Sequence, residues 1–204
     1  MKTIKNPSQS EIKIKKSQFI CRLYPTKTKE ESKKIIEKIS EEYKDATHNC
    51  TAYITSNGEG YDDNGEPNGT AGKPMINALH KNDLHNITAI VTRYFGGIKL
   101  GAGGLVRAYS RSVLEAINNS EIIEIKIYNV YTIDFKYEYM KIINKEIRDN
   151  KLIIIKKDFK ETITYDLISI HKNNIIKIFK KYNGKIRTQF KNKEALIYPP
   201  ENNY

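Results

Sequence analysis

The sequence contains no tryptophan and only two cysteines among 204 residues. Cys21 and Cys50 form no Cys-x-x-Cys pair and are too few for a disulfide framework, so we expect small buried thiols in a reducing cytoplasm. No apolar run approaches the length of a membrane span, and the lysine-rich start lacks a signal-peptide core. A serine-centred nucleophile elbow and a Gly-Lys-Ser/Thr phosphate loop are also missing. These absences favour a soluble cytoplasmic protein with no membrane partner.

The charge is strongly basic and unevenly distributed along the chain. The formal net charge is +11, and residues 126–204 hold 17 Lys and Arg against 9 Asp and Glu, whereas residues 1–125 hold 18 against 15. A basic surface of this kind attracts polyanions such as RNA. The chain is also rich in Lys, Ile and Asn, as proteins from AT-rich genomes are, so part of the basicity reflects composition alone.

The densest glycine cluster lies in residues 93–107, which read Arg-Tyr-Phe-Gly-Gly-Ile-Lys-Leu-Gly-Ala-Gly-Gly-Leu-Val-Arg. Such a cluster indicates positive φ angles or a close approach to the backbone. One hypothesis is an anion cradle, in which free N–H groups at a helix start are joined by basic side chains. The alternative is a tight strand-to-helix turn in which the glycines permit close packing. The cradle hypothesis, for phosphate or for acidic groups of a partner, uses Arg93, Tyr94, Gly96, Gly97, Lys99, Gly101, Gly103, Gly104 and Arg107.

The aromatic pair Tyr94-Phe95 directly precedes this cluster. It could offer a stacking surface for a base or for a ring of a peptide partner. From the strand pattern we expect Phe95 to be buried and Tyr94 to be partly exposed.

An acidic, glycine-containing loop covers residues 61–72. Its carboxylates Asp62, Asp63 and Glu66 could hold Mg²⁺, with Gly69 and Thr70 in the same loop. The alternative is that they cap turns and the following helix, or pair with Arg93 and Arg107 across the domain surface. No spaced ligand pattern is present, so we assign no metal and no cofactor.

His48 and Cys50 are one residue apart and would lie on one face of a strand. A Cys–His nucleophile pair would need contact between them and an orienting third group. The alternative is that both pack and form hydrogen bonds beside the acidic loop, and we assign no catalytic residue.

Periodicity divides the chain into two α+β domains, 1–125 and 126–204. In the first we expect a strand over 11–23 with a turn at Lys16-Ser17, and a helix behind the capping box of Thr28 and Glu31. The other expected elements of this domain are strands 50–56 and 87–95 and helices 74–81 and 105–118. The second domain reads as strand 127–135, helix 137–149, strands 151–157 and 161–170, helix 173–182 and strand 185–198. This β-α-β-β-α-β order is the ferredoxin-like pattern.

Four segments resemble the IMPACT/YigZ family. They are Lys16-Ser17-Gln18-Phe19-Ile20, Asp45-Ala46-Thr47-His48-Asn49-Cys50, the acidic segment 62–72 and the segment Val91 to Ser110. They occur in the family's order and cover the whole first domain. The departures are mild, with Gln18 in place of an expected Arg and Asn68 where Ser is usual.

The resemblance implies that the first domain is similar to domain IV of elongation factor G, and the second to its domain V. In that factor the pair contacts the ribosome, and eukaryotic relatives of this family regulate translation by binding the activator of a starvation kinase. We therefore expect a non-enzymatic, translation-linked regulator that binds RNA, the ribosome or a ribosome-associated partner. A protein-interaction module, or an enzyme on a phosphorylated or nucleotide substrate, are the alternatives. No heptad or exposed apolar stripe argues for assembly, so we expect a monomer.

Overall fold

The computed structural model describes residues 1–171, 174–182 and 184–197. The chain divides into two compact α+β units, Met1–Glu124 and Ile125–Tyr204, against the predicted boundary of 125/126. Strand β7 (Ile122–Phe135) runs through this boundary, and its first residues pair with the short strand β1 (Lys2–Ile4). Each unit has its own core and is described separately.

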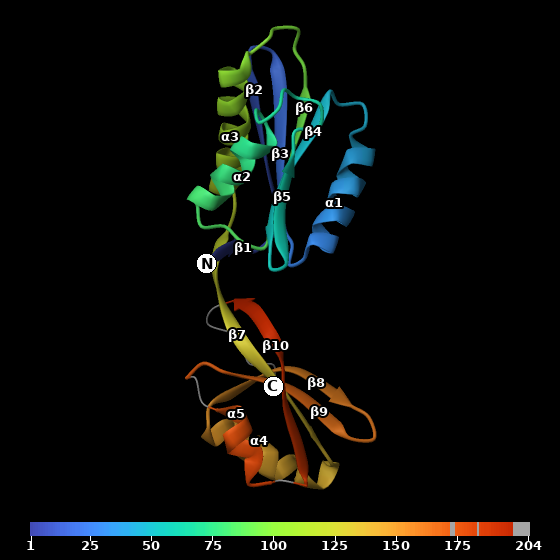
Figure 1. The fold of residues 1–204 in the computed structure, drawn as a ribbon, viewed down its shortest axis with the longest axis vertical. Coiled ribbons are helices and arrows are strands. Elements are labelled where there is room, and N and C mark those ends of the chain that lie inside the picture. Colours follow the sequence, from blue (N-terminus) through green and yellow to red (C-terminus); the bar gives the residue numbers. More distant parts are fainter. Residues whose placement is uncertain (172–173, 183, 198–204) are drawn as a thin grey trace. The chain divides into compact units, whose positions relative to one another are not determined.

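The first unit is built on an antiparallel five-stranded sheet of order β2-β3-β6-β4-β5 (Figure 1). Its strands are β2 (Ser8–Ile14), β3 (Ser17–Pro25), β4 (His48–Thr55), β5 (Gly58–Asp62) and β6 (Ile87–Tyr94). Strand β6 lies in the centre between β3 and β4, and all of its residues except Tyr94 are buried. A continuous buried run is what a central strand covered on both faces requires.

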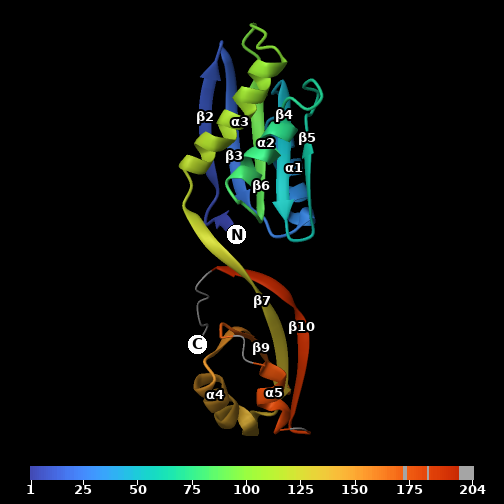
Figure 2. The same cartoon turned by 60° about the vertical axis from the view of Figure 1, so that its left-hand side comes forward.

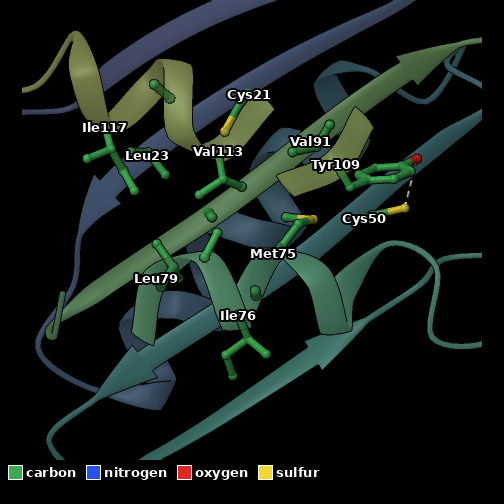
Figure 3. Packing of buried hydrophobic residues seen from close by; sticks show 14 of the residues in the cluster. Cys21, Leu23, Cys50, Met75, Ile76, Leu79, Val91, Tyr109, Val113 and Ile117 are labelled. Carbon is green, nitrogen blue, oxygen red and sulfur yellow. Dashed lines mark hydrogen bonds between the residues drawn. The ribbon is translucent and has the colours of Figure 1, made fainter. Parts of the chain in front are cut away.

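Helices cover both faces of this sheet, with α2 (Gly72–Lys81) and α3 (Ala102–Asn118) on one face and α1 (Lys29–Glu42) on the other (Figure 1). The predicted capping box of α1 is confirmed, because the Glu31 N–H donates to the Thr28 hydroxyl over 3.3 Å. Between the sheet and the α2/α3 pair, apolar side chains such as Met75, Val91 and Val113 pack together (Figure 3).

Three sequence predictions for this unit need correction. The β2–β3 turn is formed by Lys15 and Lys16, one residue before the predicted position, and both have positive φ angles of 45° and 64°. The first two residues of the predicted acidic loop, Tyr61 and Asp62, belong to strand β5. The sequence did not predict this strand, because Gly58 and Gly60 have no side chains to show an apolar–polar alternation. Helix α3 begins three residues before the predicted start, because Gly103 and its neighbour take helical conformations.

The second unit has the predicted ferredoxin-like topology, with strand order β10-β7-β9-β8 and antiparallel pairing throughout (its strands are labelled in Figure 1). After β7 its elements are η1 (Tyr137–Tyr139), α4 (Met140–Asp149), β8 (Leu152–Phe159), β9 (Ile163–Ser169), α5 (Ile175–Lys180) and β10 (Ile186–Ile197). The core contains Ile143 and Ile147 of α4 and Phe179 of α5, packed on the sheet. Residues 173 and 198, where the predicted last helix began and the last strand ended, lie outside the described residues.

None of the helices formed by the described residues has both the length and the apolar character needed to cross a bilayer.

Candidate functional site

The glycine-rich loop, residues 95–101, joins β6 to α3 and lies at the same end of the unit as the β2–β3 turn (Figures 1 and 2). A Cβ atom added to Gly96 would overlap the backbone of Lys16 and Ser17, so the loop packs directly on that turn. Gly97 and Gly101 have φ angles of 82° and 73°, in the left-handed region that favours glycine. The glycines of the loop therefore have conformational and packing reasons that hold without a bound anion.

Backbone hydrogen bonds fix the loop to its neighbours. The Phe95 N–H donates to the Thr47 hydroxyl over 2.9 Å, and the Gly96 N–H donates to the Ser17 hydroxyl over 3.1 Å. Ser17 is fully buried. The loop thus has a defined conformation before any partner binds. Neither Ser17 nor Thr47 was predicted as a site residue, because their role depends on contacts between distant segments.

Arg93 does not belong to the exposed cradle, and this prediction was wrong. Its side chain is 6% exposed and donates to the carboxylate of Glu66, whose side chain is 3% exposed. Arg93 lies on the same face of β6 as Val91, the face that packs against α2 and α3. Its charge is therefore compensated inside the unit and is unavailable to an external anion.

Glu66 is the centre of a buried polar cluster. The Tyr109 hydroxyl donates to Glu66 Oε1 over 2.8 Å, and Nε2 of His48 lies 3.8 Å from Oε2. Sγ of Cys50 lies 3.3 Å from the Tyr109 hydroxyl oxygen (Figure 3). Glu66 pairs with Arg93, as one alternative predicted, but the pair lies in the core and not on the domain surface.

The His48 and Cys50 side chains each bond to the acidic loop. His48 Nδ1 lies 2.8 Å from the Asn64 carbonyl oxygen, and the Cys50 thiol donates to the Asp63 carbonyl over 3.0 Å. Burial raises the pKa of Cys50 to about 12, with the nearby carboxylates adding to the shift and the Tyr109 hydrogen bond opposing it. The thiol is therefore protonated at neutral pH, and a thiolate nucleophile has no support here.

The remaining acidic residues are engaged by the backbone. The Asp63 carboxylate accepts N–H bonds from Gly69, Ala71 and Gly72 at 2.7, 3.0 and 2.8 Å, which satisfies donors at the start of α2. Asp62 accepts from the Asn64 N–H over 2.6 Å. Within the described residues no group of three His, Cys, Asp or Glu side chains is placed to hold a metal ion.

The residue Thr70 closes the acidic loop, because its hydroxyl donates to the Pro67 carbonyl over 2.6 Å. Gly69 has a φ angle of 75° there. Both residues therefore shape the loop rather than face a ligand.

Of the two predictions for the aromatic pair Tyr94-Phe95, the one for Tyr94 is confirmed and the one for Phe95 is wrong. Phe95 is 46% exposed, so its predicted burial was wrong, because β6 ends at Tyr94 and the strand alternation no longer holds at the next residue. Tyr94 is partly exposed, as predicted, and its hydroxyl donates to the carboxylate of Asp45. The guanidinium carbon of Arg93 lies 5.5 Å from the centre of the Phe95 ring.

Basic and apolar side chains gather around the loop on the solvent side. All are exposed, and they come from the β2–β3 turn, the loop and the first two turns of α3, where Gly103 and Gly104 also lie. We call this set the loop surface, which consists of Lys15, Lys16, Phe95, Ile98, Lys99, Val106 and Arg107. Lys99 and Arg107 were predicted from the sequence, whereas Lys15 and Lys16 join them only through the fold.

Comparison with known proteins identifies relatives that match half of the chain or more. The Impact N-terminal domain profile matches residues 15–117. The IMPACT family member YvyE of Bacillus subtilis is 40% identical over 167 residues, which cover 80% of this chain and 77% of that protein. The IMPACT family member YigZ of Escherichia coli is 46% identical over 109 residues, 51% of this chain and 53% of that one.

A solved structure has the same fold over nearly the full length. This crystal structure, described as a hypothetical protein, is 30% identical with a TM-score of 0.69, covering 95% of this chain and 98% of that one. The sequence matches and the fold match thus support the family resemblance that was inferred from the motifs around the glycine-rich loop. The chain belongs to the IMPACT family.

Proposed function

We propose that this chain is a non-enzymatic cytoplasmic regulator or accessory factor of translation. It binds RNA, the ribosome or a ribosome-associated partner through the loop surface. The family resemblance supports the link to translation, and the character of the loop surface supports the mode of binding. The observation that carries the proposal is the combination of four exposed cations with an exposed aromatic ring on a fixed loop.

The charge of the loop surface favours a polyanionic partner. Within the described residues no carboxylate forms an ion pair with Lys15, Lys16, Lys99 or Arg107. Phosphate contacts by such side chains release condensed counterions, which gives affinity that falls steeply with salt. The basic second unit, residues 126–204, would add to the attraction.

The turn conformation also supports a role for its two lysines. Lys15 and Lys16 both have left-handed backbone conformations, which cost about 1 kcal/mol or more each for a residue with a side chain. Asn-Gly would satisfy a two-residue turn of this kind with less strain. Two lysines at strained positions beside the glycine-rich loop are consistent with selection for charge.

The apolar part of the surface fits single-stranded or looped RNA. A base can stack on the half-exposed ring of Phe95 while neighbouring cations contact phosphates, and base–aromatic stacking contributes about 1–3 kcal/mol per base. The loop is held by the Ser17 and Thr47 hydroxyls, so little conformational freedom is lost on binding.

The test is co-sedimentation of the full chain with ribosomes across a salt series. The variant Lys16→Ala/Lys99→Ala/Arg107→Ala removes three charges from the loop surface, and Lys33→Ala/Lys34→Ala/Lys38→Ala removes three exposed charges from α1. In a plot of the logarithm of the association constant against the logarithm of salt concentration, we expect the slope of the first variant to be shallower than that of the wild type by about two. The second variant should have the wild-type slope. Equal weakening of both variants would contradict the proposal. Capture of one stoichiometric protein partner without ribosomes or RNA would instead favour the protein-interaction alternative.

A further inference from the structure

A pocket of about 340 Å³ lies at one end of the sheet in the second unit. The end of β7, the β8–β9 turn and the start of β10 form its walls. Its lining residues are Asp134, Phe135, Lys136, Thr162, Gly184, Lys185, Ile186 and Arg187. Its volume falls within the range of small-ligand sites, about 300–1,000 Å³.

The pocket is lined by two buried apolar residues and by charged residues next to them in the chain. Phe135 and Ile186 are buried and face each other across the β7–β10 pair as part of the core of the unit. Three exposed cations are neighbours of these two residues in the chain. Lys136 follows Phe135, and Ile186 stands between Lys185 and Arg187. Because side chains alternate along a strand, Asp134 and Arg187 lie on the sheet face opposite to Phe135 and Ile186, outside the core, where charged groups can adjust to a ligand.

The charges of the pocket are unbalanced. Three cations stand against the single carboxylate of Asp134, which lies opposite Arg187 in the strand pairing and accepts the Thr164 hydroxyl over 2.6 Å. No ion pair joins Lys136, Lys185 or Arg187 to a carboxylate in the part of the chain that the structure describes. Lys185 has an aromatic neighbour, with its Nζ 5.7 Å from the centre of the Tyr139 ring. Like charges gathered around one cavity repel one another, and a bound anion relieves this repulsion.

We propose that this pocket binds a phosphate monoester. Such a group carries a charge of about −1.5 to −2 at neutral pH and three acceptor oxygens, which match the excess of two positive charges. Arg187 provides a planar donor set suited to phosphate, and the two lysines provide compact charges. The second oxygen of Asp134 accepts a hydroxyl of the ligand.

A nucleotide or the 5′-phosphorylated end of an RNA both present this chemistry. They can be separated with adenosine 5′-monophosphate, adenosine, and a short RNA with or without a 5′-phosphate, each titrated into the full chain by calorimetry. Adenosine 5′-monophosphate binding without preference for the RNA 5′-phosphate would identify a free nucleotide, and the reverse would identify an RNA end.

The variant Lys136→Gln/Arg187→Gln tests the assignment, with Lys141→Gln/Lys145→Gln on α4 as the control of equal charge loss. We expect the pocket variant to weaken the phosphorylated probe by about tenfold or more and the control to leave it unchanged. Equal binding of adenosine and its monophosphate, equal losses in both variants, or no binding of any phosphorylated probe would overturn the proposal. The site is separate from the loop surface, so either proposal can fail while the other stands.

Discussion

The guanidinium of Arg93 donates to the carboxylate of Glu66 in the interior of the first unit, and these residues lie 27 positions apart in the sequence. Arg93 belongs to the central strand β6, and Glu66 belongs to the acidic loop that precedes α2. Tyr109 of α3 donates to the same carboxylate over 2.8 Å. These contacts therefore connect β6, the acidic loop and α3, and Arg93 lies two residues before the glycine-rich loop.

The substitution Glu66→Gln should strongly lower the free energy of unfolding of the first unit. Removing one member of a buried ion pair leaves the other charge uncompensated, which costs about 3–5 kcal/mol. Urea denaturation would measure this loss. Glu115→Gln is the control, because Glu115 makes an exposed pair with Arg111 at 3.5 Å and should change stability by about 0.5 kcal/mol or less. Similar losses in the two variants would contradict the buried-pair account.

Two glycines of the cluster should respond in opposite directions to alanine. Gly96→Ala places a methyl group into the backbone of Lys16, so we expect a loss of about 2 kcal/mol or more and weaker ribosome association. Gly103→Ala meets only Arg107 Nη1 at 3.6 Å and lies within α3, so it should be stabilising by about 0.5–1 kcal/mol. Thermal unfolding of both variants checks the pair. A stabilised Gly96→Ala protein would show that the loop does not pack as described.

The β2–β3 turn should show a conflict between stability and binding. Lys15→Asn/Lys16→Gly relieves two left-handed lysines, and we expect a gain of about 1 kcal/mol in the free energy of unfolding. The same change removes two cations from the loop surface and should weaken ribosome association. Denaturation and co-sedimentation on one preparation measure both effects. Unchanged binding would remove the turn lysines from the proposed surface.

The stability of the first unit should fall at alkaline pH through Cys50. Burial raises the pKa of this thiol to about 12 from an ordinary value near 9, so the folded state favours the neutral form. Its contribution is complete below the unfolded pKa and is lost as pH rises toward the folded one. Comparing the wild type with Cys50→Ala, we expect the wild-type advantage to shrink by about 2 kcal/mol between about pH 8 and about pH 10.5. An advantage that stays constant with pH would mean that the thiol is not held neutral.

Much of the fold follows from sequence pattern, whereas the site follows from contacts between distant segments. The apolar periodicity of residues 137–149 predicts a helix, which is observed as the 3-10 helix η1 followed by α4, and the buried run of β6 predicts its strand to within one residue. Burial on one or both faces leaves a regular signal of this kind. The β5 strand lacked that signal because Gly58 and Gly60 carry no side chain.

The placement of charge was the weakest prediction. The sequence puts Arg93 beside the glycine-rich loop, but only the sheet register turns it into the core, on the face that carries Val91. In a strand buried on both faces, alternation gives no sign of which face holds a charge. The pairing of Arg93 with Glu66, and the approach of Lys16 to Gly96, join segments whose separation in sequence carries no periodic signal.

Photo-crosslinking from position 95 would test the central claim most directly. A benzophenone amino acid replaces Phe95, which is exposed enough to tolerate it, and the control carries the same group at the exposed Leu114 of α3. In cells expressing the full chain, we predict ribonuclease-sensitive adducts from position 95 and few from position 114. Adducts at position 95 to neither RNA nor a ribosome-bound protein, or equal adducts at both positions, would contradict binding through the loop surface.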